Sequence, residues 1–218
     1  MMCGRFNLIA TPEQVIENFK LHRLPRYETS YNIPPGQKIL TVVQLDDGSY
    51  KAVYLYWGLI PHWAKDRKIS YKLINARAET VAEKSAFKSA YRQRRCLIPA
   101  TGFYEWQVTE QGKQVYCVAD QAQQLFAFAG LWEYWEHERE TIYSCTIITT
   151  AANELMSPVH QRMPVIIAAN NYKQWLNKQA TSAETGQLLV SDAYQTMQLK
   201  QVSDWVNSPA HNDKNCLN

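Results

Sequence analysis

Residues 96–129 read CLIPATGFYEWQVTEQGKQVYCVADQAQQLFAFA, and this stretch decides the fold class. Short runs of β-branched and aromatic residues follow one another at close spacing, which favours strands over helices. Gly112 supplies the turn between two of these runs. The stretch therefore predicts successive strands at residues 96–98, 103–108, 115–119 and 125–129.

Similar strand signals lie on both sides of this stretch. Upstream, residues 37–44 and 50–57 are rich in β-forming side chains, and Asp46-Asp47-Gly48 between them is a hairpin signal. Downstream, residues 142–150 and 165–168 have the same character. Because so many strands follow one another closely, we expect an antiparallel sheet that curls toward a barrel.

Helix signals are fewer. Thr11-Pro12-Glu13-Gln14 combines a capping residue, a proline at the first helical position and a glutamine three residues after the cap. Further helices are expected at about residues 81–92 and 172–177. No repeat or low-complexity linker interrupts the 218 residues. We therefore expect one α+β domain over residues 1–218, with helices flanking a curled, mostly antiparallel, barrel-like β-sheet.

The composition narrows the class of protein. A hydrophobic content of 46% is enough for a sizeable core, and the longest apolar runs, such as residues 125–131, are too short to span a membrane. The N-terminus lacks the positive-then-apolar pattern of a signal peptide, so a cytoplasmic location is expected. The five cysteines include no C-x-x-C pair, which disfavours a disulfide framework or a zinc site. Cys96, Cys117 and Cys145 lie in apolar runs and are expected to be buried.

The charge is compatible with a polyanionic partner but does not demand one. The net charge is +3, and basic residues concentrate between Lys84 and Arg95. From charge alone, this segment is better interpreted as the solvated face of a helix.

The first five residues, Met1-Met2-Cys3-Gly4-Arg5, suggest aldehyde chemistry. A cysteine at a chain terminus has both a thiol and a free α-amine, whose pKa is about 7.7–8.0. The amine condenses with an aldehyde to an imine, and the thiol then closes a five-membered thiazolidine ring. The alternative is an ordinary cysteine near a frayed terminus. Met2 complicates the first interpretation, because another cleavage, or a start at Met2, is needed to expose Cys3.

Two further segments contain groups suited to proton transfer. Glu105 lies among aromatic residues in a strand-like run, where burial would raise its pKa toward neutrality. The alternative is a strand in which Glu105 faces water. His160 and Arg162 lie between two prolines in a stiffened loop, and could transfer protons and hold a phosphate. A purely structural histidine is the alternative there.

Polar and aromatic residues elsewhere could bind a nucleic acid. Asn75 offers an amide that could orient a substrate oxygen, and Arg77 offers a phosphate ligand, unless it simply pairs with Glu79 on the surface. Candidate stacking platforms for bases are Trp57, Trp63 and Trp106, although tryptophans are more often part of a core.

Seven blocks of sequence, each ambiguous alone, together resemble the SOS-response-associated peptidase (SRAP) family. They match in order and approximate spacing across nearly the whole chain. The blocks are Met2–Phe6, Tyr31–Gly36, Trp57–Pro61, Asn75–Thr80, Arg95–Trp106, Phe128–Trp132 and Val159–Pro164.

The resemblance implies a curled-sheet α+β domain with a positively charged groove for single-stranded DNA containing abasic sites. The residues that fall on the family's catalytic positions are Cys3, Asn75, Glu105 and His160. Those that fall on its DNA-binding positions are Arg5, Pro35, Trp63, Arg77, Trp106 and Arg162. No cofactor, metal or membrane is expected, and the protein is expected to be a cytoplasmic monomer that associates with the nucleoid when it binds DNA.

The resemblance also implies a mechanism. Glu105 assists proton movement as the sugar ring opens, the Cys3 amine attacks the aldehyde, and the thiol closes the ring. His160 moves protons to or from the sugar, and Asn75 holds the Cys3 backbone or the sugar. The family name reflects a self-cleavage that frees the cysteine. Two other functions remain open: an amidohydrolase with an N-terminal nucleophile, and a module that binds DNA without a covalent bond.

Overall fold

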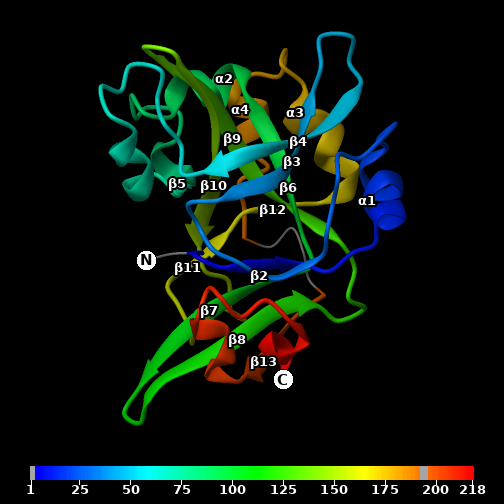
Figure 1. The fold of residues 1–218 in the computed structure, drawn as a ribbon, viewed down its shortest axis with the longest axis vertical. Helices are drawn as coiled ribbons and strands as arrows, with labels where there is room; N and C mark the ends of the chain where they lie inside the picture. The colour runs from blue at the N-terminus through cyan, green and yellow to red at the C-terminus, as the bar shows by residue number, and fades with distance from the viewer. Residues whose placement is uncertain (1–2, 192–195) are drawn as a thin grey trace.

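A computed structural model describes residues 3–191 and 196–218, arranged as two sheets with helices on the outside (Figure 1). Five strands of the larger sheet close into a barrel, because each pairs with the next and β9 pairs again with β10. These strands are, in order around the barrel, β10 (Glu140–Ala151), β4 (Tyr50–Trp57), β3 (Lys38–Gln44), β6 (Arg95–Ala100) and β9 (Phe126–His137). Most pairs are antiparallel, but β4 and β10 run parallel.

Three short strands extend this sheet, two of them beside the far end of β10 and one beside β9. β5 (Asn75–Arg77) pairs parallel with β10, and β11 (Arg162–Pro164) pairs antiparallel with it. β12 (Ile166–Ile167) pairs with β9. The chain segments around residues 75–77 and 162–164 are thus held against the same strand, although they are far apart in sequence.

The smaller sheet lies below the barrel in Figure 1. Its strand order is β13 (Met197–Val202), β8 (Gly112–Asp120), β7 (Gly102–Thr109), β1 (Phe6–Leu8) and β2 (Ser30–Ile33). Only Thr101 separates β6 from β7, so the chain passes directly from the barrel into this sheet. The pairing of β1 with β7 brings the N-terminal segment against residues 102–106.

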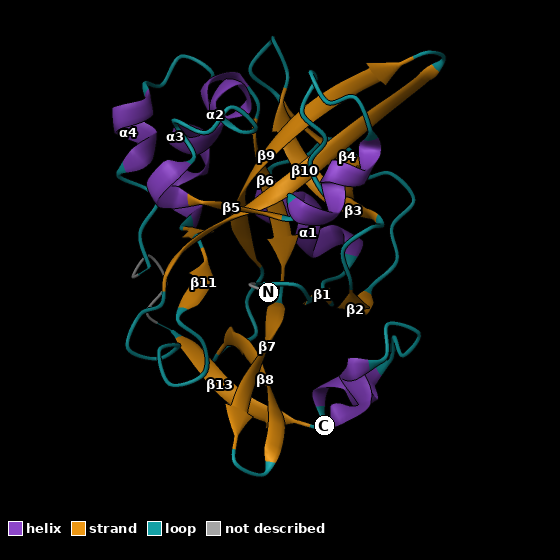
Figure 2. Ribbon diagram, turned by 90° about the vertical axis from the view of Figure 1, so that its left-hand side faces the viewer, coloured by secondary structure: helices purple, strands orange, loops and turns teal. Residues whose placement is uncertain are grey.

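The α-helices lie on the outside of the barrel, and the two 3-10 helices near the C-terminus lie beside the smaller sheet (Figure 2). The α-helices are α1 (Pro12–Phe19), α2 (Lys88–Gln93), α3 (Tyr172–Leu176) and α4 (Ser182–Gly186). The 3-10 helices are η1 (Arg67–Lys72), η2 (Ala78–Thr80), η3 (Ala169–Asn171), η4 (Asp204–Asn207) and η5 (Lys214–Leu217). At the start of α1, Thr11 and Gln14 form the reciprocal capping box that the sequence predicts. None of the described helices is long and apolar enough to cross a membrane.

A buried arginine joins two helices to the barrel. Arg95 is 4% exposed, and its guanidinium donates to main-chain oxygens at the ends of α2 and α3. These bonds reach Tyr91 O at 2.5 Å, Arg92 O at 2.9 Å, Trp175 O at 2.7 Å and Asn177 O at 2.5 Å. The last carbonyls of a helix lack partners within it, so Arg95 satisfies both helix ends at once.

The structure confirms the expected α+β fold and corrects one helix. Residues 81–87 form turns, and α2 begins only at Lys88. Val81 and Phe87 are both buried. In an α-helix, two residues six positions apart point in directions that differ by about 240°, so a helix would place these two side chains on different faces. Turns let both side chains enter the core. The expected burial of three cysteines is confirmed, with Cys96 and Cys145 0% and Cys117 5% exposed.

Candidate functional site

Cys3 and Glu105 form the centre of the candidate site. The pairing of Phe6 with Phe103, continued toward the N-terminus, brings Cys3 beside residues 105 and 106. Cys3 is fully buried, and its main-chain N–H donates to Glu105 Oε1 at 2.9 Å. The strand pairing therefore sets the position of the Cys3 nitrogen relative to the carboxyl group.

Glu105 does not face water. It is 2% exposed, and burial raises its pKa to about 7, although the hydrogen bond from Cys3 acts in the opposite direction. A carboxyl group with this pKa both accepts and donates protons near neutrality. The environment that the aromatic neighbours of Glu105 suggest in the sequence is thus present in the fold.

Two other features define the surroundings of Cys3. Burial, and then the nearby charge of Glu105, raise the pKa of the Cys3 thiol well above its ordinary value. On the other side, Asn75 Nδ2 donates to Cys3 O at 3.4 Å. Asn75 is held in β5 by its pairing with Ile147 of β10. Cys3, Asn75 and Glu105, expected at one site, are brought together.

A cleft of about 650 Å³ contains four more of the predicted residues. Its walls come from β5, β7 and the loop before β11, and the lining residues are Arg77, Trp106, Gln107, Val108, Pro158, Val159, His160, Gln161 and Arg162. Gln107 Nε2 donates to Pro158 O at 2.9 Å, which fastens the loop to β7. Because Asn75 shares β5 with Arg77, and Glu105 shares β7 with Trp106, the same two strands serve the cleft and Cys3.

His160 uses one ring nitrogen to hold its own loop. Its Nδ1 lies 3.0 Å from the main-chain N and 3.1 Å from the main-chain O of Arg162. The imidazole is half-buried in the wall of the cleft. With Nδ1 occupied, Nε2 is the nitrogen left for a bound molecule.

The two arginines of the cleft have different surroundings. The Arg162 guanidinium forms a bidentate ion pair with Glu79 and donates to Thr149 O at 2.7 Å. Arg77 is exposed, and within residues 3–191 and 196–218 it has no ion pair. The suggested surface pair of Arg77 with Glu79 is therefore replaced by a pair of Arg162 with Glu79. Arg162, and more weakly Arg77, lower the pKa of Glu79.

The remaining predicted residues lie outside the cleft lining. Arg5 is half-buried and donates to Asn32 Oδ1 at 2.7 Å and to Val206 O at 2.8 Å, which ties β1 to the C-terminal segment. Pro35 is half-buried in the turn between β2 and β3. Trp63 is 48% exposed, and its Nε1 donates to Ser85 O at 3.3 Å. Their roles with DNA stay predictions.

One stacking candidate was wrong, and three neighbours were missed. Trp57 is fully buried and donates to Ile74 O, so it belongs to the core. Glu79, Gln107 and Thr149 hold the cleft together but were not predicted as part of it. Only Glu79 carried a usable signal, as an acid two residues after Arg77.

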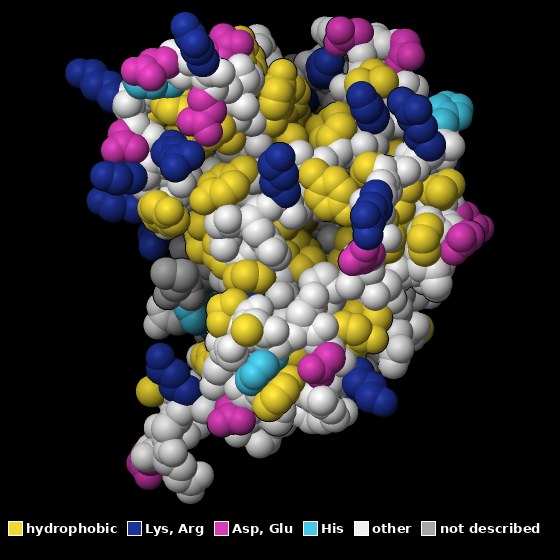
Figure 3. All heavy atoms as spheres, in the orientation of Figure 1, with side chains coloured by type: hydrophobic (Ala, Val, Ile, Leu, Met, Phe, Trp, Pro, Cys, Tyr) yellow, Lys and Arg dark blue, Asp and Glu magenta, His cyan; other side chains and the backbone are white. Residues whose placement is uncertain are grey.

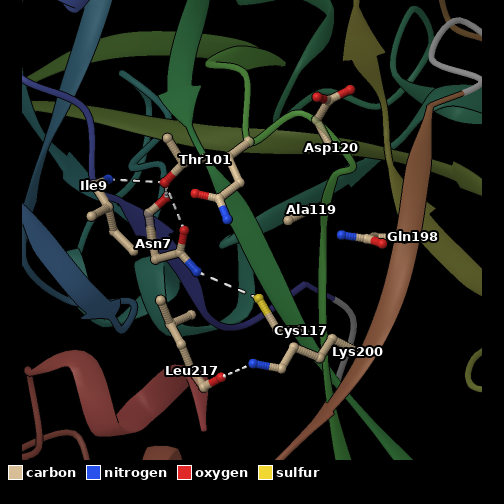
Figure 4. A pocket seen from close by; sticks show the side chains of 10 residues that line it. Asn7, Ile9, Thr101, Cys117, Ala119, Asp120, Gln198, Lys200 and Leu217 are labelled. Carbon is tan, nitrogen blue, oxygen red and sulfur yellow. Dashed lines mark hydrogen bonds between the residues drawn. The ribbon is translucent and has the colours of Figure 1, made fainter.

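A second pocket, of about 200 Å³, lies on the smaller sheet away from these residues (Figure 4). Burial raises the pKa of its Cys117 thiol to about 11. The Asp120 carboxylate already accepts from Ala122 N at 2.8 Å, Gln124 N at 3.2 Å and the Thr196 hydroxyl. The Cys117 thiol is thus protonated at neutral pH, and both oxygens of the Asp120 carboxylate already have donors. Nowhere in the described chain do three or more His, Cys, Asp or Glu side chains gather as metal ligands.

Comparison with known proteins identifies the family. A model described as SOS response associated peptidase (SRAP) matches residues 2–209. The chain belongs to this family. The described fold agrees with a crystal structure of a protein from Bacteroides thetaiotaomicron, with a TM-score of 0.88 at 24% identity over 99% of this chain and 98% of the other.

Two curated relatives come from a bacterium and a vertebrate. The abasic site processing protein YoaM of Bacillus subtilis (strain 168) is 46% identical over 99% of this chain and 97% of its own length. The abasic site processing protein HMCES of Xenopus tropicalis is 28% identical over 99% of this chain and 78% of its own length. The similarity therefore extends from bacteria to a vertebrate.

Proposed function

We propose that this protein recognises abasic sites in single-stranded DNA and bonds to them covalently through Cys3, which shields the lesion. The names of the relatives support abasic sites as the target. The observation that carries the proposal is the 2.9 Å contact between the Cys3 nitrogen and Glu105 Oε1. Once that nitrogen is a terminal amine, it has a proton acceptor beside it.

The covalent step balances without a cofactor. The neutral Cys3 amine attacks the C1′ aldehyde of the ring-opened sugar, and the resulting carbinolamine loses water to give an imine. The thiol sulfur then bonds to the imine carbon, and the thiol proton passes to the nitrogen. One aldehyde and one aminothiol thus give one thiazolidine and one water. Ring closure diverts the imine from β-elimination, which would cut the strand.

Glu105 is suited to several of these proton transfers. With a pKa near 7, it takes a proton from the amine and returns one to the departing hydroxyl. The raised pKa of the Cys3 thiol keeps sulfur protonated, so the amine reacts first.

Exposure of Cys3 fits the same geometry. The Cys3 nitrogen is the leaving group when the peptide bond before it is hydrolysed, and protonated Glu105 is placed to give it a proton. Cys3 also has φ of 22°, a left-handed value that non-glycine residues rarely adopt and that strains the backbone. We include this self-processing in the proposed function. Whether Met1 or Met2 starts the chain concerns residues outside those described.

The cleft supplies the proposed DNA contacts. We assign Arg77 to a phosphate and Trp106 to a stacked base, and Arg162 to a second phosphate that replaces Glu79 as its partner. His160 Nε2 faces no partner among the described residues and is assigned to the sugar oxygen. Asn75 is assigned to position Cys3, because its side-chain amide donates to the main-chain carbonyl oxygen of Cys3.

Intact mass spectrometry tests the proposal. Protein that begins at Cys3, mixed with an oligonucleotide containing one abasic site, should give a species whose mass is the sum of the two minus one water. The adduct should survive heating in detergent. Cys3→Ala should remove it, and Cys3→Ser should leave at most a weaker adduct. Protein that retains Met2 serves as the matched control, because its Cys3 nitrogen is an amide. An equally strong adduct in that control would overturn the role of the amine.

A further inference from the structure

We infer that nucleic acid has a second contact outside the cleft, in a groove of about 740 Å³ between β4, η1 and the start of β10. The inference rests on the proposed function, since it takes single-stranded DNA as the substrate. Lysine and arginine side chains, with some acidic ones at the edge, stand among hydrophobic ones across the upper half of the face in Figure 3, where β3 and β4 lie in Figure 1. None of the residues assigned to the Cys3 site lines this groove.

Tyrosine rings give the groove its chemistry. Tyr54, Tyr56, Tyr71 and Tyr143 all line it. Tyr71 is 70% and Tyr143 52% exposed, so their faces are open to solvent. Tyr143 is also braced by ring contacts with Trp132 and Tyr134, each at 6.4 Å between centroids. A braced, exposed ring is a platform on which any base can stack.

Cations surround these rings. Lys38, Arg67 and Lys68 line the groove together with a single carboxylate, Glu140. Glu140 lies 3.4 Å from Arg67, and Asp66, just outside the lining, lies 3.9 Å from Lys68. All four side chains of these two pairs are more than half exposed, and ion pairs of that kind are weak in water. A phosphate can therefore replace either carboxylate.

The combination favours nucleic acid over a protein partner. Tyrosine and arginine occur at both kinds of interface, but lysine is depleted at the centre of protein–protein interfaces. Here two of the three cations are lysines that flank the rings. Aromatic faces bordered by point charges match bases joined by phosphates.

The β10 strand connects the groove to the cleft. Thr149 pairs with Arg77 and Ile147 with Asn75, whereas Tyr143 lies further back on the same strand. Six residues separate Tyr143 from Thr149, about 20 Å at the rise of a strand. A stacked single strand covers that distance with about six nucleotides, so only a longer oligonucleotide can occupy both places.

Binding of undamaged DNA tests the groove without any covalent chemistry. Fluorescence anisotropy would compare thymidine oligonucleotides of about 5 and about 15 nucleotides, within the site sizes of single-strand binders. Tyr71→Ala should weaken binding of the longer one by about fivefold or more, from the lost stacking, and leave the shorter one unchanged. Tyr71→Phe keeps the ring and should bind like the wild type. Lys68→Ala should likewise weaken binding of the longer oligonucleotide only, and Lys113→Ala, at an exposed position on β8, is its matched control.

The outcomes separate this inference from the proposed function. Equal affinity of Tyr71→Ala and wild type for both lengths would overturn the groove, and is also the result expected if a protein partner occupies it. If Tyr71→Ala lowered the affinity for both oligonucleotides equally, the inference of a second contact would also be overturned, because Tyr71 would then act at the same place as the cleft. Photocrosslinking of iododeoxyuridine, moved stepwise along the longer strand, should label the peptide of Tyr71; labelling of cleft peptides alone would contradict the inference. These measurements use undamaged DNA, so they remain valid even if Cys3 forms no adduct.

Discussion

Arg162 and Glu79 form a bidentate ion pair at the wall of the cleft, with the arginine 16% and the glutamate 50% exposed. The pair occupies the Arg162 guanidinium, which can bind a phosphate only if it leaves Glu79. Glu79→Gln removes a negative charge beside Arg162 and should tighten binding of undamaged single-stranded DNA. If Arg162 then takes a phosphate, the slope of log affinity against log salt should steepen by about 0.7. Titrations at several salt concentrations check this, with exposed Glu83→Gln as the control. Weaker binding by Glu79→Gln would mean that the pair is needed to shape the cleft.

Arg77 should behave differently because it is exposed and has no such partner. Arg77→Ala should weaken DNA binding about equally across sequences and reduce the salt slope by roughly 0.7, the value for one phosphate contact on a single strand. Arg77→Lys should restore most of the slope, since it restores the charge. The same titrations measure it, and an unchanged slope in Arg77→Ala would exclude a phosphate contact.

Glu105 should control the rate of adduct formation. Glu105→Gln keeps the shape of the side chain but exchanges no proton, and general acid–base groups contribute about 10²–10⁴-fold. We expect the substitution to slow the adduct at least about tenfold without abolishing it. Burial raises the pKa of Glu105 to about 7, and the free ammonium group of Cys3 lowers it again, so the wild-type rate should change at or below about pH 7 and the variant should lose the change. Time courses with abasic oligonucleotide across pH decide this, and wild-type rates throughout would make Glu105 purely structural.

The same carboxyl group should lower stability at higher pH. Its pKa in the folded protein, about 7, lies above the ordinary value, so the folded protein keeps a proton that the unfolded chain has already lost. Stability due to this group is therefore present at low pH and is lost as the pH rises through 7. Relative to wild type, Glu105→Gln should gain about 2–3 kcal/mol between about pH 5 and about pH 8.

Urea denaturation measures this gain. The protein used should retain Met2, because a free ammonium group at Cys3 would stabilise the Glu105 carboxylate and lower its pKa. Glu110→Gln, on an exposed turn, should show no comparable trend. A difference between Glu105→Gln and wild type that is independent of pH would contradict the raised pKa.

Arg95 should be essential for stability. Arg95→Met keeps an apolar stem but leaves four main-chain carbonyls, two buried and two partly buried, without this donor. Each unsatisfied group costs about 1–3 kcal/mol, so a loss of at least about 3 kcal/mol is expected even after local relaxation. The shift of the urea midpoint measures it, and Arg92→Met, at an exposed position of α2, should change it little. A shift as small as that of Arg92→Met would show that water replaces the guanidinium.

Local patterns predicted the elements of this fold well where they are self-contained. The α1 capping box and the β3–β4 hairpin depend on neighbours in sequence, and both are found. For residues 75–77 the sequence offered a strand only as one alternative, because three residues become a strand only through pairing with β10. The parallel contact of β4 with β10 likewise depends on closure of the barrel, which no local signal encodes.

The candidate site divides in the same way. Burial of Glu105 followed from its aromatic neighbours, and proximity of Cys3 and Asn75 agrees with the family resemblance. The Arg162–Glu79 pair joins residues 83 positions apart, so sequence alone suggested the nearer Arg77 as the partner. No sequence pattern predicts the tyrosine groove, because its four rings come from three elements that are far apart in the chain.

His160 offers the last prediction, because its two ring nitrogens have separate tasks. Nδ1 is held by the main chain of Arg162, and Nε2 is assigned to the sugar. Asparagine reproduces the position of Nδ1, so His160→Asn should keep the loop in place and remove only Nε2. Adduct formation should then slow at least about tenfold, with affinity for undamaged DNA within about twofold of wild type.

Glutamine reaches the position of Nε2 but cannot transfer a proton, so His160→Gln should be equally slow. His160→Ala should also let the imine persist and raise strand cleavage. Gel time courses on one abasic oligonucleotide report both products. If His160→Asn instead matched wild type in rate, Nε2 would have no part in the chemistry, and the histidine would serve only to hold its loop.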